Sequence, residues 1–231
     1  MNNCILLTGA TGFLGTQIAH HILRNSDASV VVLLRAPHPD EAKQHLLRQW
    51  WDWPELRSFL DARIRVLAGD ITHPELGIQG AQYDMLVQQV THIVHAAANI
   101  RLFDPLDGLR KVNVTGTQHV LTLAQAAHEH HGLQRFAHIS TAYVCGARSG
   151  PITEEELTDQ YGFSNAYERS KYEAELLVRQ AATSIPVSIF RPGMIVGDSQ
   201  TGAVKTFNTK NRNTPRHALK PARLMNSHLA K

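Results

Sequence analysis

Short aliphatic segments alternate along the chain with longer segments whose apolar residues recur every three or four positions. The short segments are typical of buried strands, and the longer ones are typical of amphipathic helices. The predicted strands are Cys4–Thr8, Val30–Leu34, Ile64–Ala68, His92–His95, Arg135–Ser140 and Val187–Arg191. The predicted helices are Leu14–Asn25, Asp40–Gln49, Tyr83–Gln89, Leu106–His131 and Tyr167–Thr183. Because right-handed crossovers join parallel strands, the pattern predicts an α/β fold, a doubly wound parallel Rossmann sheet with helices on both faces.

Two connections are longer than a minimal crossover needs. Residues 44–62 carry four aromatic residues, Trp50, Trp51, Trp53 and Phe59. We expect an extra helix that packs these rings against the sheet rather than a flap that contacts substrate. Residues 147–165 carry three consecutive glutamates, which are either solvated or part of a loop that shapes a site.

A glycine-rich turn follows the first strand and leads into a helical pattern. It reads Thr8-Gly9-Ala10-Thr11-Gly12-Phe13-Leu14-Gly15. Gly9 permits a tight turn, Gly12 lets the backbone approach a pyrophosphate, and Gly15 lets the helix pack close to the strand. The helix N-terminus adds N–H donors and a positive dipole. The position of the motif between strand and helix favours a dinucleotide site made by Gly9, Thr11, Gly12, Phe13, Leu14 and Gly15.

The ends of the next two strands bear on the choice of dinucleotide. The second strand ends at Leu34-Arg35, where an NAD-selective site places an acid on the ribose hydroxyls. Arg35 instead favours a 2′-phosphate, so NADP(H) is the preferred cofactor and NAD(H) the alternative. The alternative that Arg35 is only a solvent-exposed arginine at the end of a strand remains. After the third strand, Asp70 and Ile71 are candidates for the adenine end, although Asp70 could equally cap the following turn.

A hydroxyl, a phenol and an ammonium form the candidate catalytic set. Tyr167 and Lys171 are four residues apart at the start of a helix, which places them on one face. A neighbouring ammonium and a ribose hydroxyl favour the phenolate of Tyr167, which can then pass a proton to or from a carbonyl oxygen. Ser140 and Thr141 end the fifth strand, where a hydroxyl can bind the same carbonyl.

In these residues the sequence resembles the extended short-chain dehydrogenase/reductase family. In the family pattern Thr141 takes the catalytic hydroxyl position and Ser140 is the weaker candidate. The remaining matches follow in chain order: His95-Ala96-Ala97-Ala98, Asn113-Val114-Thr115-Gly116-Thr117 and Arg191-Pro192-Gly193-Met194-Ile195-Val196-Gly197. The resemblance implies that Ala96 and Ala97 lie against the cofactor, that Pro192 and Ile195 face its nicotinamide amide, and that Asn113 is a structural or water-holding residue.

Within that family the chain is most similar to the thioester-reductase and fatty acyl-CoA reductase branch, also called male-sterility-type. The segments that carry this resemblance are Leu34-Arg35-Ala36, Pro74-Glu75-Leu76-Gly77 and Leu109-Arg110, together with residues 193–202. The branch implies NADPH-dependent reduction of a small-molecule or carrier-bound acyl thioester to an aldehyde or alcohol. Two alternatives are another enzyme of the extended family, such as a nucleotide-sugar epimerase or a hydroxysteroid-type dehydrogenase, and a non-catalytic NADP-binding remnant.

The end of the chain departs from the family pattern. Residues 203–231 hold seven Lys/Arg and no acid, which leaves 16 Lys/Arg against 20 Asp/Glu in residues 1–202. We therefore expect a Rossmann domain over residues 1–202 and a basic, divergent, disordered tail over residues 203–231. Because the family continues with further elements that build a substrate lobe, the chain is interpreted as a truncated or frame-altered reading frame from which that lobe is largely missing.

Composition narrows the remaining classes. No apolar run is long enough for a membrane span, and a cytoplasmic location is expected. The basic residues lack the periodic face of a nucleic-acid-binding surface, so no nucleic-acid partner is expected. The histidine cluster His128, His130 and His131 lies at a predicted helix end without carboxylate or cysteine partners at ligand spacing, so no metal site is expected. The resemblance allows a homodimer through the predicted helices Leu106–His131 and Tyr167–Thr183.

Overall fold

The computed structural model describes residues 3–78, 80–195 and 197. Residues 1–194 belong to one compact unit, and a second unit begins at Ile195. Of the second unit only Ile195 and Gly197 are described, and its placement relative to the first is not determined. The boundary predicted at residue 202 and the predicted basic tail lie outside the described residues. No helix in the described part of the chain is long and apolar enough to cross a lipid bilayer.

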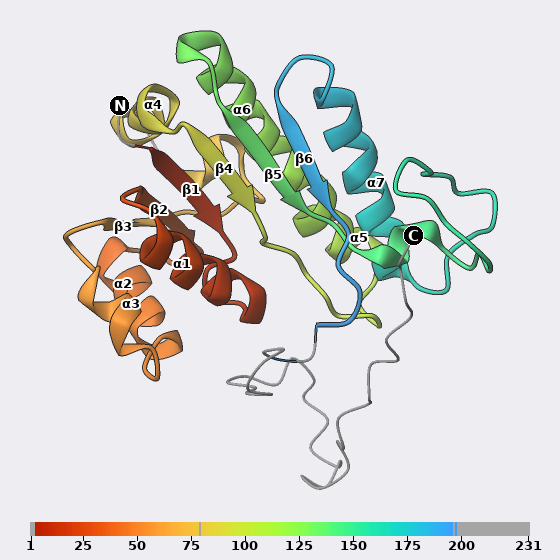
Figure 1. Ribbon diagram of the computed structural model, residues 1–231, viewed down its shortest axis with the longest axis horizontal. Coiled ribbons are helices and arrows are strands. Elements are labelled where there is room, and N and C mark those ends of the chain that lie inside the picture. Colours follow the sequence, from red (N-terminus) through yellow and green to blue (C-terminus); the bar gives the residue numbers. More distant parts are fainter. Residues whose placement is uncertain (1–2, 79, 196, 198–231) are drawn as a thin grey trace, which may run out of the picture. The chain divides into compact units, whose positions relative to one another are not determined.

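A six-stranded parallel sheet forms the centre of the first unit (Figure 1). Its order is β3-β2-β1-β4-β5-β6, and every neighbouring pair is parallel. The strands are β1 (Cys4–Thr8), β2 (Ser29–Leu34), β3 (Ile64–Ala68), β4 (His92–His95), β5 (Arg135–Ile139) and β6 (Val187–Phe190). This order confirms the predicted Rossmann fold, and the strand order reverses between β1 and β4, where such folds bind ligands.

The helices confirm the predicted segments and add short ones. The α-helices are α1 (Phe13–Asn25), α2 (Pro39–Gln49), α3 (Pro54–Ser58), α4 (Ala81–Gln89), α5 (Leu106–Arg110), α6 (Gly116–His131) and α7 (Ala166–Ala181). The short 3₁₀ helices are η1 (Pro74–Gly77) and η3 (Ala142–Cys145). The helix predicted over Leu106–His131 is not uniform, because the π-helical turn η2 (Lys111–Thr115) separates α5 from α6. Such π turns are frequent at functional sites.

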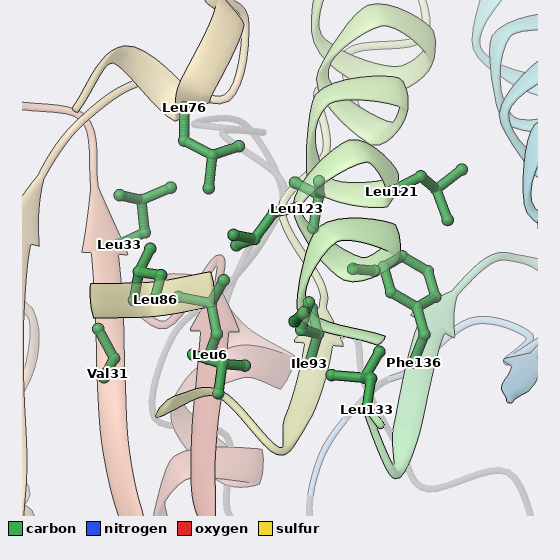
Figure 2. Packing of buried hydrophobic residues seen from close by; sticks show 14 of the residues in the cluster. Leu6, Val31, Leu33, Leu76, Leu86, Ile93, Leu121, Leu123, Leu133 and Phe136 are labelled. Atoms are coloured by element: carbon green, nitrogen blue, oxygen red, sulfur yellow. The ribbon is translucent and has the colours of Figure 1, made fainter. Parts of the chain in front are cut away.

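Alternate residues along the strands build two hydrophobic cores, one on each face of the sheet. Leu6, Val31, Ile93 and Phe136 pack with leucines of the α4 and α6 side, as Figure 2 shows. Leu7, Val30 and Val32 pack on the opposite face with residues from α1, α2 and α3. Both faces are therefore buried, which explains why the strands read as continuous apolar runs.

The aromatic connection between β2 and β3 packs against the sheet, as predicted, with one exception. Trp50 is fully buried and Trp53 nearly so, and both belong to the core on the α1 side. The prediction is wrong for Trp51, because that residue is 74% exposed. The indole N–H of Trp50 donates to the carbonyl of Ala10 at 3.1 Å. The segment between β2 and β3 thus stabilises the glycine-rich turn through this hydrogen bond.

Arginine side chains from α7 and from the end of β6 hold the backbone of the acidic loop between β5 and α7. The guanidinium of Arg179 donates to the carbonyls of Glu154 and Glu155, and that of Arg191 donates to the carbonyl of Glu156. The Glu156 carboxylate pairs with Arg148 at 2.8 Å. The three glutamates therefore include both solvated side chains and backbone anchors, and the loop is fastened to α7 and to the end of β6.

Candidate functional site

The turn between β1 and α1 requires glycine at two positions. Gly9 has a φ of +76°, and a Cβ there would lie 2.7 Å from the backbone of Ala96 and Ala97. A Cβ on Gly15 would lie 2.0 Å from the carbonyl oxygen of Gly9. Any side chain at either position collides with backbone that cannot move aside. The turn therefore brings α1, β1 and the end of β4 into direct contact.

The first turn of α1 points its free N–H groups outward from this glycine turn. The N–H of Gly12 is used within the turn, since it donates to the Gly9 carbonyl at 2.9 Å. The first helical residues Phe13, Leu14 and Gly15 have no carbonyl one turn earlier to bond. No acidic residue lies in that turn. These N–H groups and the positive end of the helix dipole are therefore free to accept an anion.

A cavity of about 350 Å³ lies at the carboxyl ends of β1, β2, β3 and β4. The structure brings together on its wall eight of the residues predicted to bind cofactor, namely Gly9, Thr11, Gly12, Arg35, Asp70, Ile71, Ala96 and Ala97. Phe13, Leu14 and Gly15 are not part of the wall, and they form the start of α1. The cavity lies at the reversal of strand order, which is where a dinucleotide binds in this fold.

Asp70 has a structural task in addition to its place on the wall. One of its carboxylate oxygens accepts from the N–H of Thr72 at 2.8 Å. The Asp70 N–H donates to the carbonyl of Leu76 at 2.7 Å. The structure therefore shows Asp70 capping the following turn, and its remaining acceptor sites leave an adenine contact open.

A histidine and a second arginine line the same hollow as Arg35. His45 and Arg48 on α2 line a second hollow of about 520 Å³ together with Arg35, and His45 also reaches the first cavity. Asp40 and Glu41 lie on the same hollow. Sequence reasoning missed His45 and Arg48, although their spacing of three residues on a predicted helix places them on one face. In the described part of the chain the Arg35 guanidinium has no hydrogen-bond or ion-pair partner.

The structure also brings two of the three predicted catalytic residues, Thr141 and Tyr167, near each other. Thr141 ends the β5 segment and begins η3, where its hydroxyl accepts from the N–H of Tyr143 at 3.3 Å. The Thr141 hydroxyl lies near the Tyr167 phenol and lowers the pKa of that phenol. Burial raises the pKa of Tyr167 by more than Thr141 lowers it. The phenol is thus protonated at neutral pH, the form that can donate a proton.

Lys171, the third residue, is 3% exposed and extends toward the sheet. Its Nζ donates to the carbonyl of Ile139 at 2.8 Å. Burial lowers the pKa of Lys171 to about 8, although the Glu175 carboxylate acts in the opposite direction. The ammonium form therefore persists at neutral pH. The phenolate expected for Tyr167 needs a ribose hydroxyl beside the phenol as well as the Lys171 ammonium, so it stays a prediction.

Ser140, the weaker candidate for the catalytic hydroxyl, faces another group. Its hydroxyl donates to Glu175 at 2.6 Å, and both residues are buried. The guanidinium of Arg191 donates to the same carboxylate at 2.6 Å, and that of Arg179 at 3.0 Å. Burial alone would raise the pKa of Glu175, but the hydrogen bonds from Arg191 and Ser140 hold it below its usual value. This buried ion pair joins α7 to the ends of β5 and β6.

Comparison with known proteins shows which family this chain belongs to. The family model described as male sterility protein matches residues 7–216. The chain belongs to the male sterility protein family. The resemblance inferred from the motifs is thereby confirmed, and the chain is homologous to thioester reductase domains and fatty acyl-CoA reductases.

This male sterility family member spans less than half the length of the curated relatives that it matches. Isonitrile lipopeptide synthase of Mycobacterium tuberculosis is 33% identical over 214 residues, which cover 84% of this chain and 8% of that protein. Fatty acyl-CoA reductase wat of Drosophila melanogaster is 27% identical over 223 residues, covering 83% of this chain and 43% of the relative. Among solved structures, the terminal R domain of the myxalamid PKS-NRPS biosynthetic pathway matches with a TM-score of 0.77 and 32% identity, covering 87% of this chain and 51% of that chain.

The last two predicted cofactor contacts of this male sterility family member follow β6. The carbonyl of Pro192 accepts from the N–H of Ala142 at 2.9 Å, which places Pro192 beside the start of η3. Ile195 opens the second unit, and its position relative to the cavity is not determined, so its role stays a prediction. Within the residues that the structure describes, no three His, Cys, Asp or Glu side chains converge as metal ligands would.

Proposed function

We propose that this chain is an NADPH-dependent reductase of acyl thioesters, either acyl-CoA or acyl groups on a carrier, and that it yields an aldehyde or alcohol. The observation that carries the proposal is the proximity of the Thr141 hydroxyl to the Tyr167 phenol, with Lys171 buried on the same helix as Tyr167. This group lies at the carboxyl ends of the strands, on the same edge of the sheet as the dinucleotide cavity. Membership of the family supports the same reaction.

The chain's own residues suit a dinucleotide in three respects. Gly9 and Gly15 leave no room for side chains where the backbone closes the turn, α1 offers its first N–H groups, and Arg35 stands unpaired in the described part of the chain at the end of β2. NADPH, when bound, supplies the hydride. We assign the pyrophosphate to the start of α1, and the 2′-phosphate to Arg35 with Arg48 and His45.

The proposed proton chemistry follows from the protonation states. The Tyr167 phenol donates its proton to the carbonyl oxygen of the thioester, while the Thr141 hydroxyl orients the same oxygen. The ammonium of Lys171 holds α7 to β5 and keeps a positive charge on the catalytic helix as the proton leaves. The carbonyl carbon gains the hydride and its oxygen gains the phenol proton. The C–S bond then breaks, and the hydroxyl proton passes to the departing thiolate, which leaves an aldehyde and a free thiol.

Exposed apolar side chains on the same edge of the sheet suit an acyl substrate. Phe103 is 97% exposed and Met194 is 77% exposed. Ile100, Leu102 and Tyr143 are also exposed, and these residues come from segments that follow β4, β5 and β6. Exposed large apolar residues near a site favour an apolar ligand or a covering domain.

The test is turnover by the full 231-residue chain. The purified protein is mixed with NADPH and a long-chain acyl-CoA or an acyl group on a carrier, and both NADPH consumption and aldehyde formation are measured. We expect consumption that depends on the thioester and leaves free thiol. Turnover of a UDP-sugar instead would favour the epimerase alternative, and cofactor binding without any turnover would favour the non-catalytic remnant.

The cofactor preference gives a separate prediction. Replacing Arg35 with alanine removes a charge-assisted hydrogen bond to the 2′-phosphate, so we expect the Kd of NADPH to rise about 10- to 100-fold. The Kd of NADH, which has no such phosphate, is expected to stay within about twofold. Both constants are measured by quenching of tryptophan fluorescence.

A matched control for that variant is Arg57→Ala on α3. Arg57 is also an exposed arginine, but it lines neither of the two hollows that Arg35 lines. Its replacement is expected to leave both dissociation constants unchanged. An equal loss of NADPH and NADH affinity in the Arg35 variant would contradict the assigned phosphate contact.

A further inference from the structure

A chain of buried hydrogen bonds runs from the wall of the cofactor cavity toward α7. The N–H of Ala97, on the cavity wall, donates to the Thr8 hydroxyl at 3.2 Å. That hydroxyl lies 2.8 Å from Nδ1 of His95. On the other side of the ring, Nε2 of His95 lies 3.0 Å from the Thr117 hydroxyl, which reaches the carbonyl of Asn113 at 2.6 Å.

The direction of each bond in this chain is fixed by counting hydrogens. The Thr117 hydroxyl has one hydrogen, and the Asn113 carbonyl can only accept it. Toward His95 the hydroxyl therefore acts as acceptor, so Nε2 carries the ring hydrogen. In a neutral ring Nδ1 is then an acceptor, and the Thr8 hydroxyl donates to it.

The surroundings of His95 agree with a neutral ring. Burial, and to a smaller extent the Lys171 ammonium, lower the pKa of His95 to about 3. His138 on β5 lies with its ring centroid 5.5 Å away, and burial with Lys171 also lowers its pKa well below the usual value. The series of hydrogen bonds from Ala97 to Asn113 therefore keeps the same donors and acceptors across the physiological pH range.

The side chain of Asn113 carries the connection on to Tyr167. Its amide nitrogen donates to the Ser170 hydroxyl at 2.8 Å, and that hydroxyl donates to the backbone carbonyl of Tyr167 at 2.8 Å. The same amide bonds the backbone of Asn99 in both directions. Thr8, His95, Asn113, Thr117 and Ser170 are each at most 1% exposed.

We propose that this buried hydrogen-bond chain sets the position of Tyr167 against the cofactor wall, with His95 and Thr117 as positioning residues. The inference rests on the proposed function for its kinetic consequence. The residues of this hydrogen-bond chain come from β1, β4, η2, α6 and α7. The π-helical turn η2, which carries Asn113, therefore links the cavity wall to the catalytic helix α7. A shift of about 1 Å in such a link can slow the chemical step about 100-fold without touching the reacting atoms.

Two substitutions at one position test the proposal. Thr117→Val keeps the shape but removes the hydroxyl, leaving His95 Nε2–H and the Asn113 carbonyl without their partner. Thr117→Ser keeps the hydroxyl and loses only a methyl group. With the full chain we expect kcat to fall about 10- to 100-fold in the valine variant, while the Kd of NADPH changes by less than about threefold. The serine variant is expected to retain wild-type kcat. Equal kcat in both variants would overturn the proposal.

Two spectroscopic readouts do not depend on turnover. The ¹⁵N shifts of His95 are expected to report hydrogen on Nε2 and a bare Nδ1 between pH 5.5 and 8, and hydrogen on Nδ1 would contradict the bond directions. The ¹³Cζ signal of Tyr167, recorded with NADPH, is expected to move in the valine variant and not in the serine variant. If the chain turns over no thioester, the proposed function fails, whereas an unmoved Tyr167 signal overturns the positioning proposal itself.

Discussion

Replacing Tyr167 with phenylalanine is expected to lower kcat about 100- to 10,000-fold, because the phenol is the group that donates the proton to the substrate carbonyl oxygen. The ring remains, so the fold and the Kd of NADPH are expected to change little. The measurement is the steady-state rate of thioester-dependent NADPH oxidation, alongside NADPH binding to the same preparation.

Tyr172 offers a matched control on the same helix. It lies five residues further along α7, and its ring packs against Phe163 with a centroid distance of 5.1 Å. Tyr172→Phe removes the same hydroxyl but leaves the ring contact, so we expect wild-type turnover. If Tyr167→Phe behaves like Tyr172→Phe, the proton-donor role is wrong, and the non-catalytic remnant gains support.

The second large effect is on stability. Replacing Glu175 with glutamine leaves the Arg191 guanidinium without its buried counter-charge, and we expect the free energy of unfolding to fall by about 3–5 kcal/mol. The carboxylate is fully buried and accepts hydrogen bonds from Ser140, Arg179 and Arg191. Urea unfolding at pH 7 measures the loss. The loss is a large part of the total, since domains are stable by only about 5–15 kcal/mol.

An exposed ion pair provides the comparison for Glu175. Lys43 and Asp61 are 2.8 Å apart, and the Asp61 side chain is 77% exposed. Asp61→Asn keeps a residue that tolerates the positive φ there and is expected to cost about 1 kcal/mol or less. Equal losses in the two variants would contradict the account of the buried pair.

The pH dependence of the Glu175 effect has a definite sign. The pKa of this carboxyl is lower in the folded chain than the ordinary value of 4.5. Its stabilisation is therefore present above that value and is lost as the pH falls through the lowered pKa. The difference between the wild type and Glu175→Gln is expected to narrow below pH 4.5.

Sequence patterns predicted the sheet well, because strands buried on both faces are continuous apolar runs. Cys4–Thr8, Ile64–Ala68 and His92–His95 agree with the structure at both ends. The glycine turn was equally predictable, since its chemistry is local. The extra helix expected within residues 44–62 is the short α3, whose bounds could not be predicted because five residues carry too little periodicity.

The buried polar contacts were beyond sequence reasoning. Ser140 and Thr141 are adjacent and chemically alike, yet Ser140 donates to Glu175 whereas Thr141 lies near Tyr167. Which hydroxyl faces the site depends on where β5 ends, one residue before the predicted end. His95 is similar in this respect, because its partners Thr8 and Thr117 lie 87 and 22 residues away along the chain.

The most direct test of the central claim is titration of the full chain with NADPH and with NADH, monitored by tryptophan fluorescence. We predict saturable binding of one dinucleotide per chain, with NADPH bound more tightly than NADH. Absence of binding by either dinucleotide would contradict the account, because the glycine turn, the start of α1 and Arg35 would then serve no cofactor.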